Sequence, residues 1–130
     1  MNWNLLSDVT SQALAAALRG AAARHKALAD NIANVDTPGF IRKEVDFEEA
    51  LGLALQRARR APQRAAELIS SLSPRPRRDR SLPARADGNN VDIDREMVAL
   101  ARNSLRYHAA NEGLAARIRL LRSAIHAGRR

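Results

Sequence analysis

The chain of 130 residues lacks cysteine and has few aromatic side chains. The absence of cysteine excludes a disulfide scaffold, a thiolate metal site and a cysteine nucleophile. Aromatic residues make up 3% of the chain, although a compact core of this size ordinarily buries more large rings. The apolar residues are mainly alanine and leucine, which favour helix, as do the abundant arginine and glutamate. The composition therefore predicts an all-α protein.

Long apolar runs are also missing. No run approaches the roughly 20 residues that a membrane span needs, and residues 1–14 lack the basic start and apolar block of a cleaved signal peptide. No Ser-His-acid or paired-carboxylate arrangement can be placed on adjoining faces. We therefore expect no membrane span, no catalytic residues, no metal site and no cofactor.

Positive charge is concentrated in the middle of the chain. The net charge is +8, and residues 52–86 contribute +7 of it, since nine arginines there face only Glu67 and Asp79. Four of the five prolines lie in the same stretch. Such a segment repels itself and interrupts helix. We predict ordered segments over 1–51 and 87–130, joined by a basic linker over 52–86 that is mobile or only locally helical.

The N-terminal segment has the heptad spacing of a coiled-coil helix. Ser7, Asp8 and Thr10 are candidate N-caps for a helix of about 25 residues. We expect His25, one of the heptad positions, to be packed or partly exposed and not a ligand. The apolar stripe needs a covering partner, because a single amphipathic helix is unstable alone. The heptad positions are Leu14, Leu18, Ala21, His25, Leu28, Ile32 and Val35.

The C-terminal segment has a matching a/d pattern. It predicts a helix from about Asp92 to Ala127, with Gly128 as the stop. We expect the two terminal helices to pair in a coiled-coil-like bundle, antiparallel or side by side, completed by other subunits. The two heptad rows are Ile93, Leu100, Tyr107, Leu114 and Leu121, and Met97, Ser104, Asn111, Ile118 and Ile125. We expect assembly to bury Leu14, Leu18, Leu28, Ile32, Leu100, Leu114, Ile118 and Leu121.

A turn must follow the first helix. Pro38 disfavours helix at Thr37, and Gly39 permits a positive backbone angle. The string from Ala29 to Phe40 resembles the Asn-Ile-Ala-Asn-x-x-Thr-Pro-Gly-Tyr signature near the N-terminus of bacterial flagellar rod and hook proteins. Phe40 replaces the usual tyrosine. The signature residues are Asn31, Asn34, Thr37, Pro38, Gly39 and Phe40.

A second motif indicates which members of that family the chain resembles. Residues 87–97, followed by Asn103 to Tyr107, resemble the C-terminal signature of the proximal-rod members of that family. The resemblance implies a structural subunit of the flagellar basal body, located in the periplasmic rod. It also implies self-association, contacts with other rod proteins, the inner-membrane ring and the export gate, and export by the flagellar type III apparatus.

One short motif relates to export. Phe47 and Leu51 are four residues apart and therefore share a helical face. This spacing fits simple packing of a short helix. It also resembles the Phe-x-x-x-apolar sequence that the export gate recognises in early flagellar subunits.

Two alternatives rest on polar clusters. Asp87, Asn89, Asp92, Asp94 and Glu96 superficially resemble a calcium loop, but their spacing departs from the EF-hand order, so we favour capping and turn roles. The arginines from Arg57 to Arg85 suggest, as an alternative function, a small basic nucleic-acid-associated protein. No aromatic residue interleaves with them to stack bases. We therefore expect no nucleic-acid partner.

Overall fold

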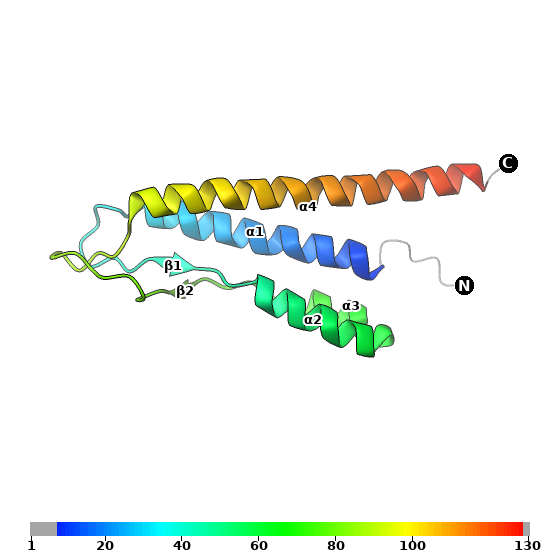
Figure 1. The fold of residues 1–130 in the computed structure, drawn as a ribbon, viewed down its shortest axis with the longest axis horizontal. Coiled ribbons are helices and arrows are strands. Elements are labelled where there is room, and N and C mark those ends of the chain that lie inside the picture. The colour runs from blue at the N-terminus through cyan, green and yellow to red at the C-terminus, as the bar shows by residue number, and fades with distance from the viewer. Residues whose placement is uncertain (1–7, 129–130) are drawn as a thin grey trace.

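Two long helices form an elongated pair, and a smaller helical hairpin covers one side of it (Figure 1). The computed structural model describes residues 8–128. The all-α fold with paired terminal helices is confirmed, and the one sheet in the described residues is a short antiparallel ribbon. The elements are α1 (Val9–Ala33), β1 (Lys43–Glu44), α2 (Glu48–Arg60), the 3-10 turn η1 (Pro62–Arg64), α3 (Ala65–Ser70), β2 (Arg77–Arg78) and α4 (Ile93–Ala127).

The ends of both long helices follow local signals in the sequence. The Asp8 carboxylate accepts a hydrogen bond from the Thr10 backbone N–H at 3.2 Å and caps α1, which has 25 residues. The Asp92 carboxylate likewise caps α4, which ends before Gly128. These predicted boundaries are confirmed. None of the helices within the described range has the length and hydropathy needed to cross a bilayer.

The two long helices run antiparallel. Asp8, before the start of α1, forms an ion pair with Arg117 near the end of α4, and Asn31 near the end of α1 bonds to Glu96 in the first turn of α4. Between these points, the Asn103 side-chain amide donates to the Ala21 carbonyl oxygen at 2.8 Å.

One of the two predicted heptad rows on α4 is wrong for the contact with α1. Glu96 and Asn103 are each 1% exposed, whereas Met97, which follows Glu96, is 51% exposed and Ile118, which follows Arg117, is 41% exposed. The polar row lies inward because each member finds a hydrogen-bond or charged partner on α1 or just before it, which an apolar pattern cannot reveal. The predicted row was Met97, Ser104, Asn111, Ile118 and Ile125; the observed one includes Glu96, Asn103 and Arg117.

The buried apolar core lies on the other side of α1. Val45, Phe47 and Ile69 pack there against small residues of α1. Gly20 leaves room for the Phe47 ring, because a Cβ atom at this position would stand 2.2 Å from Cδ1 of Phe47. The second, alanine- and glycine-rich face of α1 is absent from the sequence prediction, since the heptad spacing defined a single stripe along the helix.

The middle of the chain contains regular structure. Helix α2 crosses the predicted segment boundary at residue 51 and continues to Arg60, and η1, α3 and β2 follow within 52–86. Local helix therefore occurs in this arginine-rich stretch. Its mobility stays a prediction.

The Gly20 contact gives a stability test. Gly20→Ala should destabilise the protein by roughly 1–3 kcal/mol, because the new methyl group overlaps the Phe47 ring and the core must shift. The matched control is Gly52→Ala in α2, where nothing lies within 4 Å of the added Cβ. That change should stabilise by up to about 1 kcal/mol, because alanine favours helix. Urea unfolding followed by circular dichroism measures both, and equal effects would contradict the packing.

Candidate functional site at the loop end of the helix pair

The loop after α1 is closed by its own side chains. The Asn34 side-chain amide donates to the Asp30 carbonyl oxygen at 2.8 Å, and the Thr37 hydroxyl donates to Oδ1 of Asn34 at 3.1 Å. Gly39 has φ +72°, the positive backbone angle that the sequence analysis expected glycine to permit here. These bonds stop the helix and turn the chain back along α1.

A second loop, just before α4, is attached to the first through one asparagine. Asn89 is fully buried, and its Nδ2 lies 2.9, 3.1 and 2.8 Å from the carbonyl oxygens of Asn34, Val35 and Thr37. Its Oδ1 accepts a bond from the Val91 backbone N–H at 2.7 Å. The Gly39 N–H donates to the Asp87 carbonyl oxygen at 2.8 Å. The two loops are therefore joined by several hydrogen bonds.

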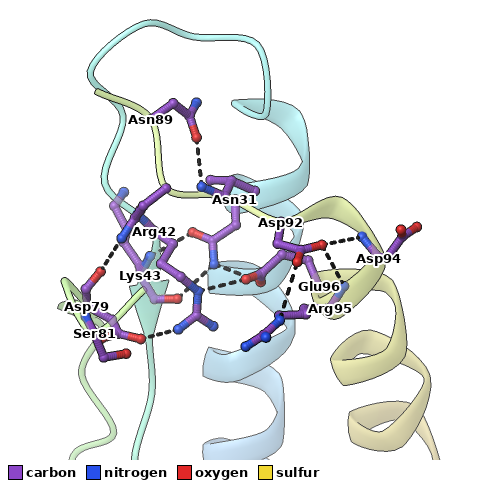
Figure 2. A network of polar contacts seen from close by, with 12 residues as sticks. Asn31, Arg42, Lys43, Asp79, Ser81, Asn89, Asp92, Asp94, Arg95 and Glu96 are labelled. Carbon is purple, nitrogen blue, oxygen red and sulfur yellow. Dashed lines mark hydrogen bonds and ion pairs between the residues drawn. The ribbon is translucent and has the colours of Figure 1, made fainter. Parts of the chain in front are cut away.

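Beneath the loops, Figure 2 shows a network of polar contacts around the buried carboxylate of Glu96. Asn31 donates to Oε2 of Glu96 at 2.9 Å, and Arg42 Nε donates to Oε1 at 2.7 Å. Asn31 also bonds both backbone groups of Lys43, donating to its carbonyl at 2.8 Å and accepting from its N–H at 2.7 Å. The network thus joins α1, β1 and α4.

Arg42 extends the network to the second strand. Its guanidinium forms an ion pair with Asp79, which is 7% exposed. Hydrogen bonds from Ser81, followed in weight by those from Arg42, hold the pKa of Asp79 below its usual range. Asn90 bridges the same pair, accepting from the Arg42 N–H and donating to the Asp79 carbonyl, each at 2.7 Å. Every charge in this buried cluster therefore has a partner.

A more exposed carboxylate joins three helices. Glu48, the first residue of α2, forms ion pairs with Arg24 of α1 and with Arg106 of α4. The hydrogen bonds from Arg24 lower the pKa of Glu48 from 4.5 to about 2. The carboxylate thus stays charged at any physiological pH and holds α2 to the helix pair.

The amino-acid sequence is similar to those of known proteins. Residues 12–40, which cover most of α1 and its turn, match the family model described as flagella basal body rod protein. The Escherichia coli flagellar basal body rod protein FlgB is 33% identical over 86% of this chain and 89% of its own length. The Bacillus subtilis FlgB is 32% identical over 92% and 95%, and that of Borrelia hermsii 38% over 65% and 71%. The chain belongs to the FlgB family. It is therefore a structural subunit of the flagellar basal body rod, not an enzyme, and it associates with other rod components.

The predicted signature residues of this FlgB-family chain meet at one end of the molecule. Asn31 is in the buried network, and Asn34 and Thr37 close the turn. Pro38 is exposed, while Phe40 is half-buried with the Lys43 ammonium 5.8 Å from its ring centroid. Their role in assembly stays a prediction.

The remaining predicted residues lie elsewhere. Phe47 is 4% exposed in the core, and Leu51 packs beside it. His25 is exposed on α1. Seven of the predicted assembly residues are buried or half-buried and only Ile118 is exposed: Leu14, Leu18, Leu28, Ile32, Leu100, Leu114, Leu121.

The carboxylates of the superficial calcium loop have structural partners. Asp87 accepts from the Asn89 N–H at 3.0 Å, Asp92 caps α4, and Glu96 pairs with Arg42. Among residues 8–128, no three histidine or acidic side chains gather as a metal ion would need. The roles favoured from the sequence are confirmed for Asp92, which caps a helix, and for Asp87, which bonds within a turn.

Sequence reasoning missed Arg42, Asp79 and Asn90. Arg42 stands 54 positions from Glu96, and no local pattern records that partnership. Asn89 and Asn90 did stand directly after Gly88 in the second signature, so a search for asparagines that follow a turn glycine would have found them.

The Asn89 contacts can be tested by truncation. Asn89→Ala should destabilise by roughly 1–3 kcal/mol, because it leaves buried carbonyl oxygens of the first loop without donors. Asn111→Ala, the same change at an exposed position of α4, should stay within about 0.5 kcal/mol of the parent. Hydrogen exchange of residues 34–40 should rise in the first variant only; unchanged protection would show that the loops hold without Asn89.

Proposed function

We propose that this chain polymerises in the proximal rod by packing the terminal helices of successive subunits together. It would thereby connect the inner-membrane ring and the export gate with the rest of the rod, on the periplasmic side. The observation that carries the proposal is an apolar row that is left uncovered along α4 and is interrupted in its middle by Ser104 and Asn111. Ile93, Met97, Ile118 and Ile125 are 45%, 51%, 41% and 53% exposed.

The position of this row supports a contact with further helices. Met97 and Ile118 each follow a residue of the α1 contact by one position, which places them about 100° around the helix. A helix whose apolar surface extends this far beyond one partner is typical of bundles with more than two helices. Full burial of each such side chain would contribute about 1.5–3 kcal/mol to the free energy of association.

We propose that the signature turn sets the register of this packing. Asn31 and Asn89 hold the loops and the start of α4 in one arrangement. Buried polar contacts of this kind specify register in helical bundles. The apolar row would then be presented to neighbouring subunits in a fixed direction.

The assembly proposal is tested by charging the row. Met97→Asp combined with Ile118→Asp should leave the monomer folded, since both side chains are largely exposed, but should abolish rod assembly, because carboxylates cannot be buried unpaired. Motility and basal-body yield in a strain lacking the native gene measure the result. The control, Arg75→Ser with Arg80→Ser, changes exposed residues of the middle segment and should swim normally. Severe loss from the control alone would overturn the proposal and favour the nucleic-acid alternative.

We further propose that Phe47 and Leu51 form an export signal that is read on the unfolded chain. Phe47 is 4% exposed in the folded protein, so folding would hide the signal from the export gate. This arrangement fits subunits that travel unfolded and fold after delivery.

Export and folding can be separated with two variants. Phe47→Ala should lower the amount of chain exported, whereas Ile69→Ala, which opens the same core at a fully buried position, should not. Both variants should lose roughly 2–5 kcal/mol of stability. The exported and intracellular chain are measured by immunoblot. Equal export of the two variants would show that Phe47 serves packing alone.

A further inference from the structure

A groove lies between α1, β1 and α4, and its cavity has a volume of about 590 Å³. It is separate from the exposed apolar row of α4. Arg95, which lines the groove, and Met97, which belongs to the row, stand on either side of Glu96 in the sequence. They therefore lie about 100° from Glu96 in opposite directions around the helix. The groove and the row thus flank the contact with α1 on its two sides.

Arginine side chains form one wall of the groove. Arg95, Arg102 and Arg106 follow one flank of α4, because their spacing of seven and four residues returns them to the same side of the helix. All three are exposed. Among the described residues that line the groove, six are cationic and two are acidic, Glu44 and Asp94. The groove therefore favours an occupant with negative charge.

The arginine wall is only partly neutralised by the protein itself. Arg102 forms no hydrogen bond or ion pair with another described residue. Arg106 shares the carboxylate of Glu48 with another arginine, and Arg95 lies 3.3 Å from Oδ2 of Asp92 in an exposed pair. Exposed pairs contribute little, because both groups stay solvated. The wall can therefore offer guanidinium groups to carboxylates from outside, which guanidinium binds through two parallel hydrogen bonds.

Apolar side chains complete the same surface. Ala27, Leu28 and Val45, all buried, line the groove beside the arginines. Val98 of α4 also lines it and is 52% exposed, and Leu105, seven residues further on the same helical face, is 71% exposed. Exposed apolar residues flanked by arginine are typical of protein interaction surfaces, in which arginine is enriched and lysine depleted.

We propose that this groove binds an acidic amphipathic helix of a partner protein. Carboxylates of that helix would pair with Arg95, Arg102 and Arg106, and its apolar side chains would cover Val98 and Leu105. The three arginines span eleven positions of α4, about 17 Å, which is the length of about three helical turns. Charge complementarity selects an acidic occupant and disfavours a basic one, and an apolar groove along a helix suits a second helix.

Nucleic acid is the competing occupant, because its phosphates also pair with arginine. The apolar residues disfavour it, since a phosphate backbone has no apolar side chain to cover Val98 and Leu105. None of the described residues that line the groove is aromatic, so bases have no ring on which to stack. The acidic helix satisfies both the charged and the apolar part of the surface. This inference does not rest on the assembly proposal, because it uses another face of α4.

Fluorescence anisotropy with a labelled synthetic peptide tests the charged part of the surface. The probe is an amphipathic peptide of about 14 residues, or about 21 Å of helix, with leucines on one face and glutamates on both sides of them. The parent protein should bind it less tightly as salt rises. Arg102→Glu should weaken binding by at least about tenfold, because it places a like charge opposite the glutamates. Arg57→Glu, the same change at an exposed arginine of α2, should leave the affinity unchanged.

A second pair of variants tests the apolar part of the surface. Val98→Ser should weaken peptide binding by about threefold, because it removes apolar contact area. Leu53→Ser in α2 changes a residue of similar exposure, 47%, and should have no effect. Circular dichroism checks that all four variants keep their helices.

The outcomes separate the two occupants. Weaker binding in Arg102→Glu and Val98→Ser, with parent affinity in both α2 variants, supports the acidic helix. Failure of the parent to bind the peptide, binding that ignores Val98→Ser, or an equal loss in Arg57→Glu overturns the proposal. A single-stranded oligonucleotide that binds more tightly than the peptide, and loses affinity in Arg102→Glu, identifies nucleic acid as the occupant and overturns it as well.

Discussion

The structure depends on one buried carboxylate, that of Glu96. A carboxylate that is 1% exposed is tolerated only when charges and hydrogen bonds compensate its lost hydration. Arg42 and Asn31 provide both, and Arg42 is itself kept in place by Asp79. The need to pair one charge therefore fixes the positions of α1, both strands and the start of α4 together. Loss of any member would leave an unpaired buried group at the point where the loops meet the helices.

The two long helices contact each other partly through polar residues and leave apolar residues exposed. Their mutual contact contains polar residues, Glu96, Asn103 and Arg117, each bonded to a specific partner, while an apolar row on α4 stays exposed. Polar contacts are selective because they are satisfied in a single register, whereas apolar contacts contribute more of the free energy of association. This division supports the proposal that polar bonds specify the fold of this FlgB-family monomer and that apolar burial drives its assembly.

Close packing at the other face of α1 connects folding with the proposed export step. Phe47 fits against Gly20 only because glycine has no side chain, and the same ring begins the proposed export motif. Glu48, the next residue, joins Arg24 and Arg106 and so holds this helix to both long ones. Recognition by the export gate and burial in the core would thus be alternative states of one phenylalanine.

Much of this architecture could be predicted because the deciding interactions are local. Asp8 and Asp92 cap helices through backbone groups two or three residues away, heptad spacing is a property of a single helix, and Gly39 needs a positive φ within its own turn. The residues of each segment alone therefore specify the two long helices, their ends, the turn and the family signatures. Packing between distant segments sets which row of α4 faces α1, where the Phe47 ring fits, and how Glu96 is neutralised. Those outcomes depend on partners such as Arg42, 54 positions from Glu96, and whether two such groups meet is set by the packing of whole elements.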